Sequence, residues 1–140
     1  MVIVDTNILA ELMKESPAQA VLSWVNGQES SALFVTTITV GEIGYGLRIM
    51  PQGRRRSQLE QGFERFLADG FAGRILDFDE EAARQYGEVM GRRKEMGRPV
   101  GVQDGQIVSI ARAKGYAVAT RNVRDFVECG VEIINPFEAS

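Results

Sequence analysis

The sequence contains no histidine and only one cysteine, Cys129, among its 140 residues. The absence of histidine excludes Ser-His-Asp triads, paired-histidine nucleases and imidazole metal sites. A single cysteine excludes an intrachain disulfide and a cysteine-rich structural metal site. Any catalysis must therefore come from carboxylates, hydroxyls, amides or cationic side chains.

Long apolar runs and an excess of positive charge are also missing. No segment approaches the ~20 apolar residues that span a bilayer, and the apolar run at 1–4 ends at Asp5. We therefore expect a cytoplasmic protein that does not enter a membrane. The net charge of −3 and the pI near 5.1 argue against binding of nucleic acid by bulk positive charge. Contacts with nucleic acid would have to be local or metal-mediated.

The residues that are present fit a single α/β domain spanning 1–140. With 44% hydrophobic and 25% charged residues, the chain can bury one core but not two. Short β-type apolar runs alternate with longer helical ones, and no repeat or linker interrupts them. These runs predict five strands, at 2–4, 33–36, 75–78, 117–119 and 132–134.

Capping and breaking signals divide the rest of the chain into helices. Ser16-Pro17 predicts a helix start and Gly27 its end, while Thr37 or Thr39 would cap the next helix. The other predicted helices cover 37–50, 54–68, 79–94 and 102–114. Strands separated by helices favour a parallel sheet covered on both faces, with ligands at the carboxyl ends of the strands.

Asp5 follows the first predicted strand directly and is therefore expected at the mouth of the sheet. Thr6 and Asn7 complete a polar turn from this strand into a helix. An aspartate in such a place often does no more than cap the helix. Asp5 alone thus leaves a structural and a functional interpretation open, and two further acidic residues favour the functional one.

Glu42 and Asp104 each share a helix face with apolar residues, which predicts that both carboxylates point toward the core. The neighbours at helical spacing are Ile38, Tyr45 and Ile49 for Glu42, and Ile107, Val108 and Ala111 for Asp104. An inward carboxylate needs a cationic partner or a metal ion. Salt bridges with arginines are the structural alternative, although no nearby position supplies an obvious partner.

Asp5, Glu42 and Asp104 together predict a metal centre. Three carboxylates without histidine or clustered cysteine offer hard oxygen ligands, which suit Mg²⁺ or Mn²⁺ better than zinc. Such an ion orients a phosphodiester, neutralises developing negative charge and lowers the pKa of an attacking water. The carboxylate set therefore indicates a nuclease or a phosphatase.

A second polar segment follows the fourth predicted strand. Thr120 and Asn122 are candidates to position a water or a phosphate oxygen. Arg121 and Arg124 are candidates to contact a nucleic-acid backbone. An ordinary turn with solvated arginines is the alternative. If the extended backbone continued, Thr120 and Asn122 would point to the same side, toward Asp5.

Four short motifs contain the candidate site residues. They are Val-Asp-Thr-Asn at 4–7, Val-Gly-Glu-Ile at 40–43, Asp-Gly-Gln-Ile at 104–107 with Ala111, and Ala-Thr-Arg-Asn at 119–122. In this order they resemble the motifs of PIN-domain toxins, most closely VapC toxins including the FitB-like branch. Each motif is short, but the resemblance extends over nearly the whole chain, to the Asn-Pro-Phe at 135–137.

The resemblance implies a PIN-like domain with a parallel sheet in the order 3-2-1-4-5 and Mg²⁺-dependent endoribonuclease activity, with Mn²⁺ as a possible substitute. Asp5 and Asp104 would be the most direct metal ligands. The expected site residues are, for catalysis, Asp5, Glu42, Asp104 and Asn122; for substrate binding, Thr6, Thr120 and Arg121; and for the metal, Asp5, Asp104 and Glu42.

The resemblance also implies partners. The substrate would be a structured RNA such as tRNA or rRNA. The chain would be the toxin of a type II toxin–antitoxin system, would form a homodimer, and would be silenced by a small VapB- or FitA-like antitoxin that covers the site. DNA would be contacted only through that antitoxin.

Two positions depart from the family pattern. Asn122 stands where aspartate is common, and Asp125 follows three residues later. We expect Asn122 to take the fourth place in the site, and Asp125 to order the turn through amides or a neighbouring arginine. Gly105 stands where a bulkier residue, often alanine, is usual, and glycine near a helix start lowers stability.

Two functions of other classes are alternatives to a nuclease. A PIN-like module that binds RNA or protein without cutting it would have no reason to retain three inward acids. A phosphotransferase with Asp5 as covalent nucleophile would need a second acid two residues later, where this chain has Asn7.

Overall fold

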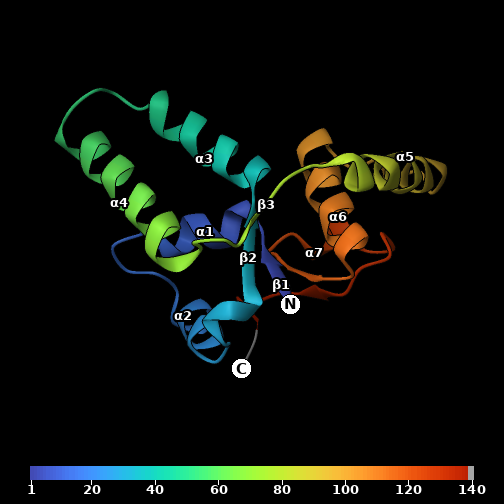
Figure 1. The fold of residues 1–140 in the computed structure, drawn as a ribbon, viewed down its shortest axis with the longest axis horizontal. Helices are drawn as coiled ribbons and strands as arrows, with labels where there is room; N and C mark the ends of the chain where they lie inside the picture. The colour runs from blue at the N-terminus through green and yellow to red at the C-terminus, as the bar shows by residue number, and fades with distance from the viewer. Residues whose placement is uncertain (139–140) are drawn as a thin grey trace.

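A computed structural model of the protein describes residues 1–138, and a five-stranded sheet lies at its centre (Figure 1). All strand pairs are parallel and the order is β3-β2-β1-β4-β5, as the family resemblance implied. The strands are β1 (Val2–Val4), β2 (Leu33–Thr36), β3 (Ile75–Leu76), β4 (Ala117–Ala119) and β5 (Ile133–Ile134). Strand β1 thus has β2 on one side and β4 on the other. The carboxyl end of β1 is therefore the switch point of the sheet, where ligands bind in such folds.

Helices cover both faces of this sheet, as Figure 1 shows. Residues of α1 to α4 pack against one face, and residues of α5 to α7 pack against the other. The helices are α1 (Thr6–Leu12), α2 (Gln19–Asn26), α3 (Thr37–Arg48), α4 (Arg54–Gly70), α5 (Glu80–Glu95), α6 (Val102–Lys114) and α7 (Val123–Phe126), with a 3-10 turn at Ser30–Ala32. None of the helices within residues 1–138 is both long and apolar enough to cross a membrane.

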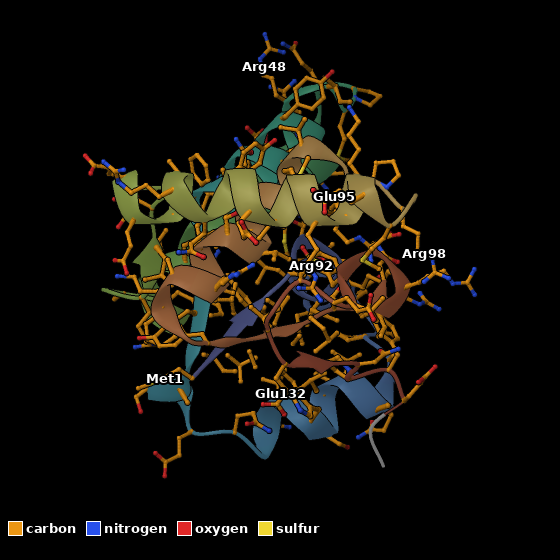
Figure 2. The ribbon with its side chains drawn as sticks, turned by 90° about the vertical axis from the view of Figure 1, so that its right-hand side faces the viewer. Met1, Arg48, Arg92, Glu95, Arg98 and Glu132 are labelled. Carbon is orange, nitrogen blue, oxygen red and sulfur yellow. The ribbon has the colours of Figure 1, made fainter. Side chains whose placement is uncertain are left out.

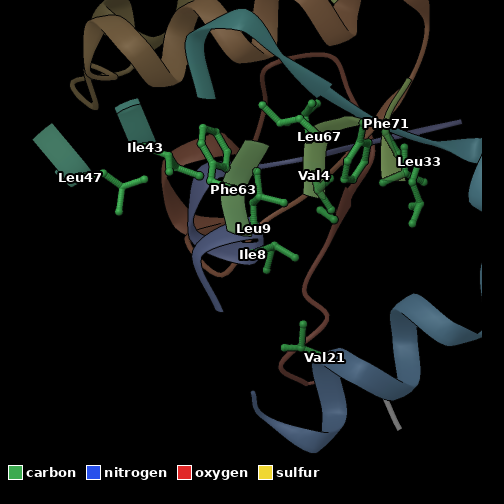
Figure 3. Close-up of a cluster of buried hydrophobic side chains, with 14 residues drawn as sticks. Val4, Ile8, Leu9, Val21, Leu33, Ile43, Leu47, Phe63, Leu67 and Phe71 are labelled. Carbon is green, nitrogen blue, oxygen red and sulfur yellow. The ribbon is translucent and has the colours of Figure 1, made fainter. Parts of the chain in front are cut away.

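Strand β1 separates two hydrophobic cores because its side chains alternate between the faces of the sheet. Val2 and Val4 point into the first core and Ile3 into the second. Figure 3 shows Val4 in the first core, facing the phenylalanines Phe63 and Phe71 that lie around α4. Both cores hold β1 rigidly, so the residue that follows it has a fixed position.

Helices α3 and α4 form an arm that extends away from the sheet (Figure 1). Figure 2 shows Arg48 projecting from the far end of this arm. Tyr45 and Ile49, near the same end, are 68% and 65% exposed. The packed side of α3 instead carries Thr39, Ile43 and Leu47, which are buried.

Several predicted element ends and caps differ from the structure. Helix α2 begins at Gln19, after the predicted Ser16-Pro17 start, and Ala18 is its N-cap. The carboxylate of Glu11 accepts the Ala18 N–H at 2.8 Å, so a residue in α1 supplies the cap that the local sequence was expected to provide. Helix α3 is capped by Thr36, whose hydroxyl accepts the Thr39 N–H. Strands β3 and β5 are shorter than predicted.

Candidate active site

Asp5 lies at the carboxyl end of β1, where its backbone N–H donates to the Ala119 carbonyl of β4 at 2.9 Å. Its side chain is 3% exposed and accepts three hydrogen bonds. The Thr6 N–H donates to Oδ1 at 2.8 Å, while the Thr120 hydroxyl and the Asn7 amide donate to Oδ2 at 2.8 and 3.2 Å. Asp5 therefore caps α1, as the structural interpretation expected, and is also the centre of a polar network between β1 and β4.

Burial has the largest influence on Asp5 and raises the pKa of its carboxyl above the ordinary value. The hydrogen bonds from Thr120 and Thr6 lower this pKa, and the negative charge of Glu42 raises it further. The carboxylate is thus held in place by donors, although its charge remains unfavourable where it is.

Glu42 of α3 joins this network through Thr6. The Thr6 hydroxyl donates to Glu42 Oε1 at 2.9 Å and lies 3.0 Å from the Thr39 hydroxyl. Thr6 thus binds Asp5 with its backbone N–H and Glu42 with its side chain. This single residue sets the relative positions of two of the predicted carboxylates.

The reason given for an inward Glu42 was wrong. Tyr45 and Ile49, which were expected to share its core-facing side, are among the exposed apolar residues of the arm. The buried stripe of α3 runs through Thr39, Ile43 and Leu47 instead, and Glu42 lies half-buried beside it. Glu42 therefore lies at the rim of the site, where a hydroxyl and solvent satisfy its carboxylate.

Asp104 lies in the first turn of α6, half-buried, and its helix face is the predicted one because Ile107, Val108 and Ala111 are buried. Loss of hydration, together with the smaller effects of the negative charges of Asp5 and Asp125, raises the pKa of Asp104 to about 6. Within residues 1–138 no hydrogen bond or ion pair holds its carboxylate. The fold thus brings Asp104 within the electrostatic reach of Asp5 without neutralising either charge.

The described part of the chain contains no ready-made group of three metal-ligating side chains. It also contradicts the salt-bridge alternative, because the ion pairs found between residues 1 and 138 involve none of the three predicted carboxylates. These ion pairs are Lys14–Glu11, Arg56–Glu60 and Arg84–Glu80. Asp5, Glu42 and Asp104 are neighbours linked by hydrogen bonds and charge rather than members of a closed cage.

At the end of β4, Thr120 and Arg121 have different environments. Thr120 is fully buried and its hydroxyl is used by Asp5, so it contacts Asp5 and not a surface open to substrate. Arg121 is exposed, with its guanidinium 4.3 Å from the centre of the Phe137 ring. Of these two expected substrate contacts, Arg121 is the one that faces solvent.

Asn122 and Asp125 belong to the turn into α7. Strand β4 ends at Ala119, and Asn122 has φ −91° and ψ 57°, so the extended backbone expected between Thr120 and Asn122 is absent. The Asn122 N–H donates to the Thr120 hydroxyl at 3.1 Å. In the described chain, the Asp125 carboxylate makes none of the expected bonds to turn amides or arginines. A polar hollow lined by residues 121–125 lies beside them.

Sequence reasoning did not single out Asn7, which connects the two strand ends. Its amide nitrogen donates to Asp5 and to the Thr120 hydroxyl, and its Oδ1 accepts the Arg121 N–H at 3.1 Å. Its place in the motif at 4–7 was the available signal. Thr39 was expected only as a possible helix cap, and its contact with Thr6 could not be predicted because it depends on how α3 packs against α1.

The donor set fits a divalent metal ion. Asp5 and Asp104 are hard oxygen donors whose pKa values are raised by burial, and the Asp5 charge adds to the effect on Asp104. A cation between them would reverse both effects, and no arginine or lysine of the described chain pairs with either carboxylate.

Residues 2–130 match the PIN domain family. The chain is 41% identical over 138 residues to VapC ribonuclease Y4jK of Sinorhizobium fredii, an alignment that covers 99% of both chains. It is 30% identical to toxin FitB of Neisseria gonorrhoeae, with 98% of this chain and 99% of the toxin covered. The solved structure of FitAB bound to an IR36 DNA fragment superimposes with a TM-score of 0.93 at 29% identity, covering 100% of this chain and 98% of the other.

Proposed function

Because this chain belongs to the PIN-domain family, with the VapC ribonucleases and FitB toxins, we propose that it is a Mg²⁺-dependent endoribonuclease that works as the toxin of a toxin–antitoxin pair. Ribonucleases of this family depend on metal ions in general, and the ion proposed here is Mg²⁺, with Mn²⁺ as a substitute. The observation that carries the proposal is the pair of unneutralised carboxylates, Asp5 and Asp104, at the switch point of the sheet.

In the proposed site, Asp5 and Asp104 would hold the metal ion and Glu42 would complete the acidic set. A bound Mg²⁺ would neutralise charge on the phosphodiester and make an attacking water more acidic. Thr120, Asn7 and the Thr6 N–H fix the Asp5 carboxylate, so its oxygens are oriented before an ion or RNA arrives. This preorganisation avoids reorganisation during the reaction.

The remaining roles are divided between the rim and the turn. Glu42, whose carboxylate accepts a hydrogen bond from the Thr6 hydroxyl, is proposed to orient a water or accept its proton. Asn122 is proposed as the fourth residue of the site, where its amide would orient a water without adding charge. Arg121, exposed beside the polar hollow, is proposed to contact an RNA phosphate.

The central test is cleavage of purified tRNA and rRNA by the pure protein, with Mg²⁺, with Mn²⁺ and with excess chelator. We expect cleavage with either ion and none in chelator. Asp104→Asn should reduce the rate by about 10³-fold or more, because it removes a charged ligand from the transition state. Asp69→Asn is the matched control, since Asp69 is an exposed aspartate on α4 and should leave the rate unchanged.

Three outcomes would contradict the nuclease assignment. Binding of RNA without cleavage under every metal condition would favour the silent PIN-like module. Equal cleavage by wild type and Asp104→Asn would indicate a contaminating nuclease. A burst of phosphoenzyme from a small phosphate ester, lost in Asp5→Asn, would favour the phosphotransferase.

We also propose the partners and the setting of the reaction. Its similarity to a chain in the FitAB structure, which contains DNA, supports an antitoxin partner that covers the site and contacts DNA on behalf of the toxin. A homodimer, a cytoplasmic location and a tRNA or rRNA target belong to the same proposal. The exposed Tyr45 and Ile49 of the arm are apolar surface available to such a partner.

Expression in a bacterial host tests the toxin role. Induction of the chain alone should slow growth, and co-expression of a small protein encoded beside it should restore growth. Asp104→Asn should be harmless while still binding the partner. Harmless expression of a protein that cleaves RNA in vitro would contradict the toxin role and leave the nuclease activity standing.

A further inference from the structure

Arg93 is a buried arginine whose environment the proposed chemistry does not explain. It lies in the last turn of α5 and is 3% exposed, whereas its neighbour Arg92, labelled in Figure 2, is exposed. Burial of a guanidinium is unfavourable unless its charge and its donors are satisfied. Within residues 1–138 no carboxylate lies within ion-pair distance of it. A guanidinium buried in this way therefore calls for a structural or functional reason.

The guanidinium donates to two backbone carbonyls around α7. Nη1 donates to the Val127 carbonyl at 2.7 Å, and Nη2 to the Arg124 carbonyl at 3.4 Å. Nε has no partner in the described structure. The two carbonyls lie at the carboxyl end of a short helix, where unsatisfied C=O groups carry partial negative charge. Arg93 therefore acts as a cationic cap supplied by a different helix.

Helix α7 needs such support because it spans only Val123–Phe126. A helix of one turn is not stable by itself, because nucleation of a helix is unfavourable. Asn122 also makes no side-chain capping bond at its start. Besides the Arg93 contacts, Phe126 anchors the turn by being fully buried in the second core. The position of α7 is thus set by the buried ring of Phe126 and the guanidinium of Arg93.

The segment that α7 fixes faces the site. Asn122 and Asp125 line the polar hollow at the end of β4, and the Asp125 charge acts on Asp104. Asn122 also donates its N–H to Thr120, which holds Asp5. A shift of α7 would therefore move both Asn122, which is bonded to Thr120, and Asp125, whose charge acts on Asp104.

We propose that Arg93 is a positioning residue, whose hydrogen bonds to the Arg124 and Val127 carbonyls hold the segment 122–126 against the carboxylate site. This inference rests on the proposed nuclease function. Arg93 contacts neither RNA nor metal in this proposal. It acts only through the backbone of the turn that carries Asn122 and Asp125.

The test compares Arg93→Met, which keeps an unbranched apolar side chain but removes the charge and the donors, with Arg92→Met at an exposed position of the same helix turn. Amide hydrogen exchange at 123–127 should become about 10-fold faster in Arg93→Met, while the β1 and β4 amides keep their protection. The Mn²⁺ concentration for half-maximal RNA cleavage should rise by about 10-fold, as for loss of an outer-shell support. Arg92→Met should change neither quantity.

Arg93→Gln provides a second variant, which keeps an amide donor and should fall between wild type and Arg93→Met. If Arg93→Met does not fold, Arg93→Gln carries the comparison. Exchange that is unchanged at 123–127, or that rises equally throughout the molecule with an unchanged Mn²⁺ requirement, would overturn the proposal and leave Arg93 a residue of general stability. If the wild type cleaves no RNA, the nuclease function fails, and the exchange experiment still decides whether Arg93 holds α7.

Discussion

Asp5 and Asp104, the two carboxylates at the switch point, lie in different environments. Asp5 is almost fully buried and accepts hydrogen bonds from Thr6, Asn7 and Thr120. Asp104 is half-buried and accepts none within residues 1–138, and its pKa rises to about 6. Both carry charge that their surroundings disfavour, but only Asp5 is fixed by donors.

This difference indicates how the work is divided. Fixed donors orient Asp5 in advance, whereas Asp104 keeps its lone pairs free and has no cationic partner in the described chain. A carboxylate left this way is available to an ion from solution. The contrast extends to the turn after β4. The Asn122 N–H donates to Thr120, which binds Asp5, whereas the charge of Asp125 acts on Asp104.

The largest expected effect separates these two turn residues. Asn122→Ala should lower the rate of RNA cleavage by about 10- to 100-fold with a modest loss of metal affinity, as for loss of a group that orients water. Asp125→Asn should lower it less, because it removes only a neighbouring charge. A Mg²⁺ titration of both variants decides the matter. If Asp125→Asn needs far more Mg²⁺ and Asn122→Ala does not, the assignment is reversed and Asp125 is the ligand.

A second effect concerns the stability of the metal-free protein when Thr6, Asn7 and Thr120 lose the carboxylate oxygen of Asp5 that accepts their hydrogen bonds. In Asp5→Asn, an amide nitrogen replaces one carboxylate oxygen and meets donors that are already oriented. We expect the free energy of unfolding in chelator to fall by about 1–2 kcal/mol, the range for unsatisfied buried donors. Urea unfolding at pH 7.5 measures it. A gain in stability would show that the buried charge, and not the hydrogen bonds, dominates at Asp5.

Asp104→Asn should act in the opposite direction. The folded-state pKa of Asp104, about 6, lies above the ordinary value of 3.8 for an aspartate, so ionisation disfavours the fold progressively from about pH 4 and fully above about pH 6. The variant should therefore be more stable than wild type in chelator at pH 7.5, by about 1–2 kcal/mol after allowance for solvent screening at a half-exposed group. The gain should vanish at pH 3.5. A gain independent of pH would exclude titration of Asp104 as its cause.

The smallest expected effect tests how closely α6, and with it Asp104, must pack against α5. A Cβ added at Gly105 would collide with Met90 Sδ and lie 3.3 Å from Tyr86. Gly105→Ala gains up to about 1 kcal/mol of helix propensity but must displace Met90, so we expect a net loss below about 1 kcal/mol. In a Met90→Ala background the same substitution should become stabilising. Additive effects in this double-mutant cycle would show that the two side chains do not compete.

Several features could be predicted from the sequence because they depend on local chemistry. Helix α6 has the predicted bounds, since Gly115 ends it in the left-handed conformation and its apolar residues have a clear period. The apolar residues of β1 and β4 predicted two of the strands, and Asp5 was correctly expected at the strand end. The absence of histidine and the hard acidic residues indicated which kind of metal chemistry to look for.

Other features were decided only by tertiary structure, because the groups involved are far apart in the sequence. The Thr6–Glu42 hydrogen bond spans 36 positions and the Thr120–Asp5 bond spans 115, so no local pattern could reveal that Thr120 would be buried against Asp5. The face of Glu42 was misjudged because periodicity shows that a helix has an apolar side but not which apolar residues remain outside the core. The pKa of Asp104 likewise depends on charges that the strand order brings near it, and Arg93 donates to carbonyls 31 and 34 positions away, which no local pattern could reveal.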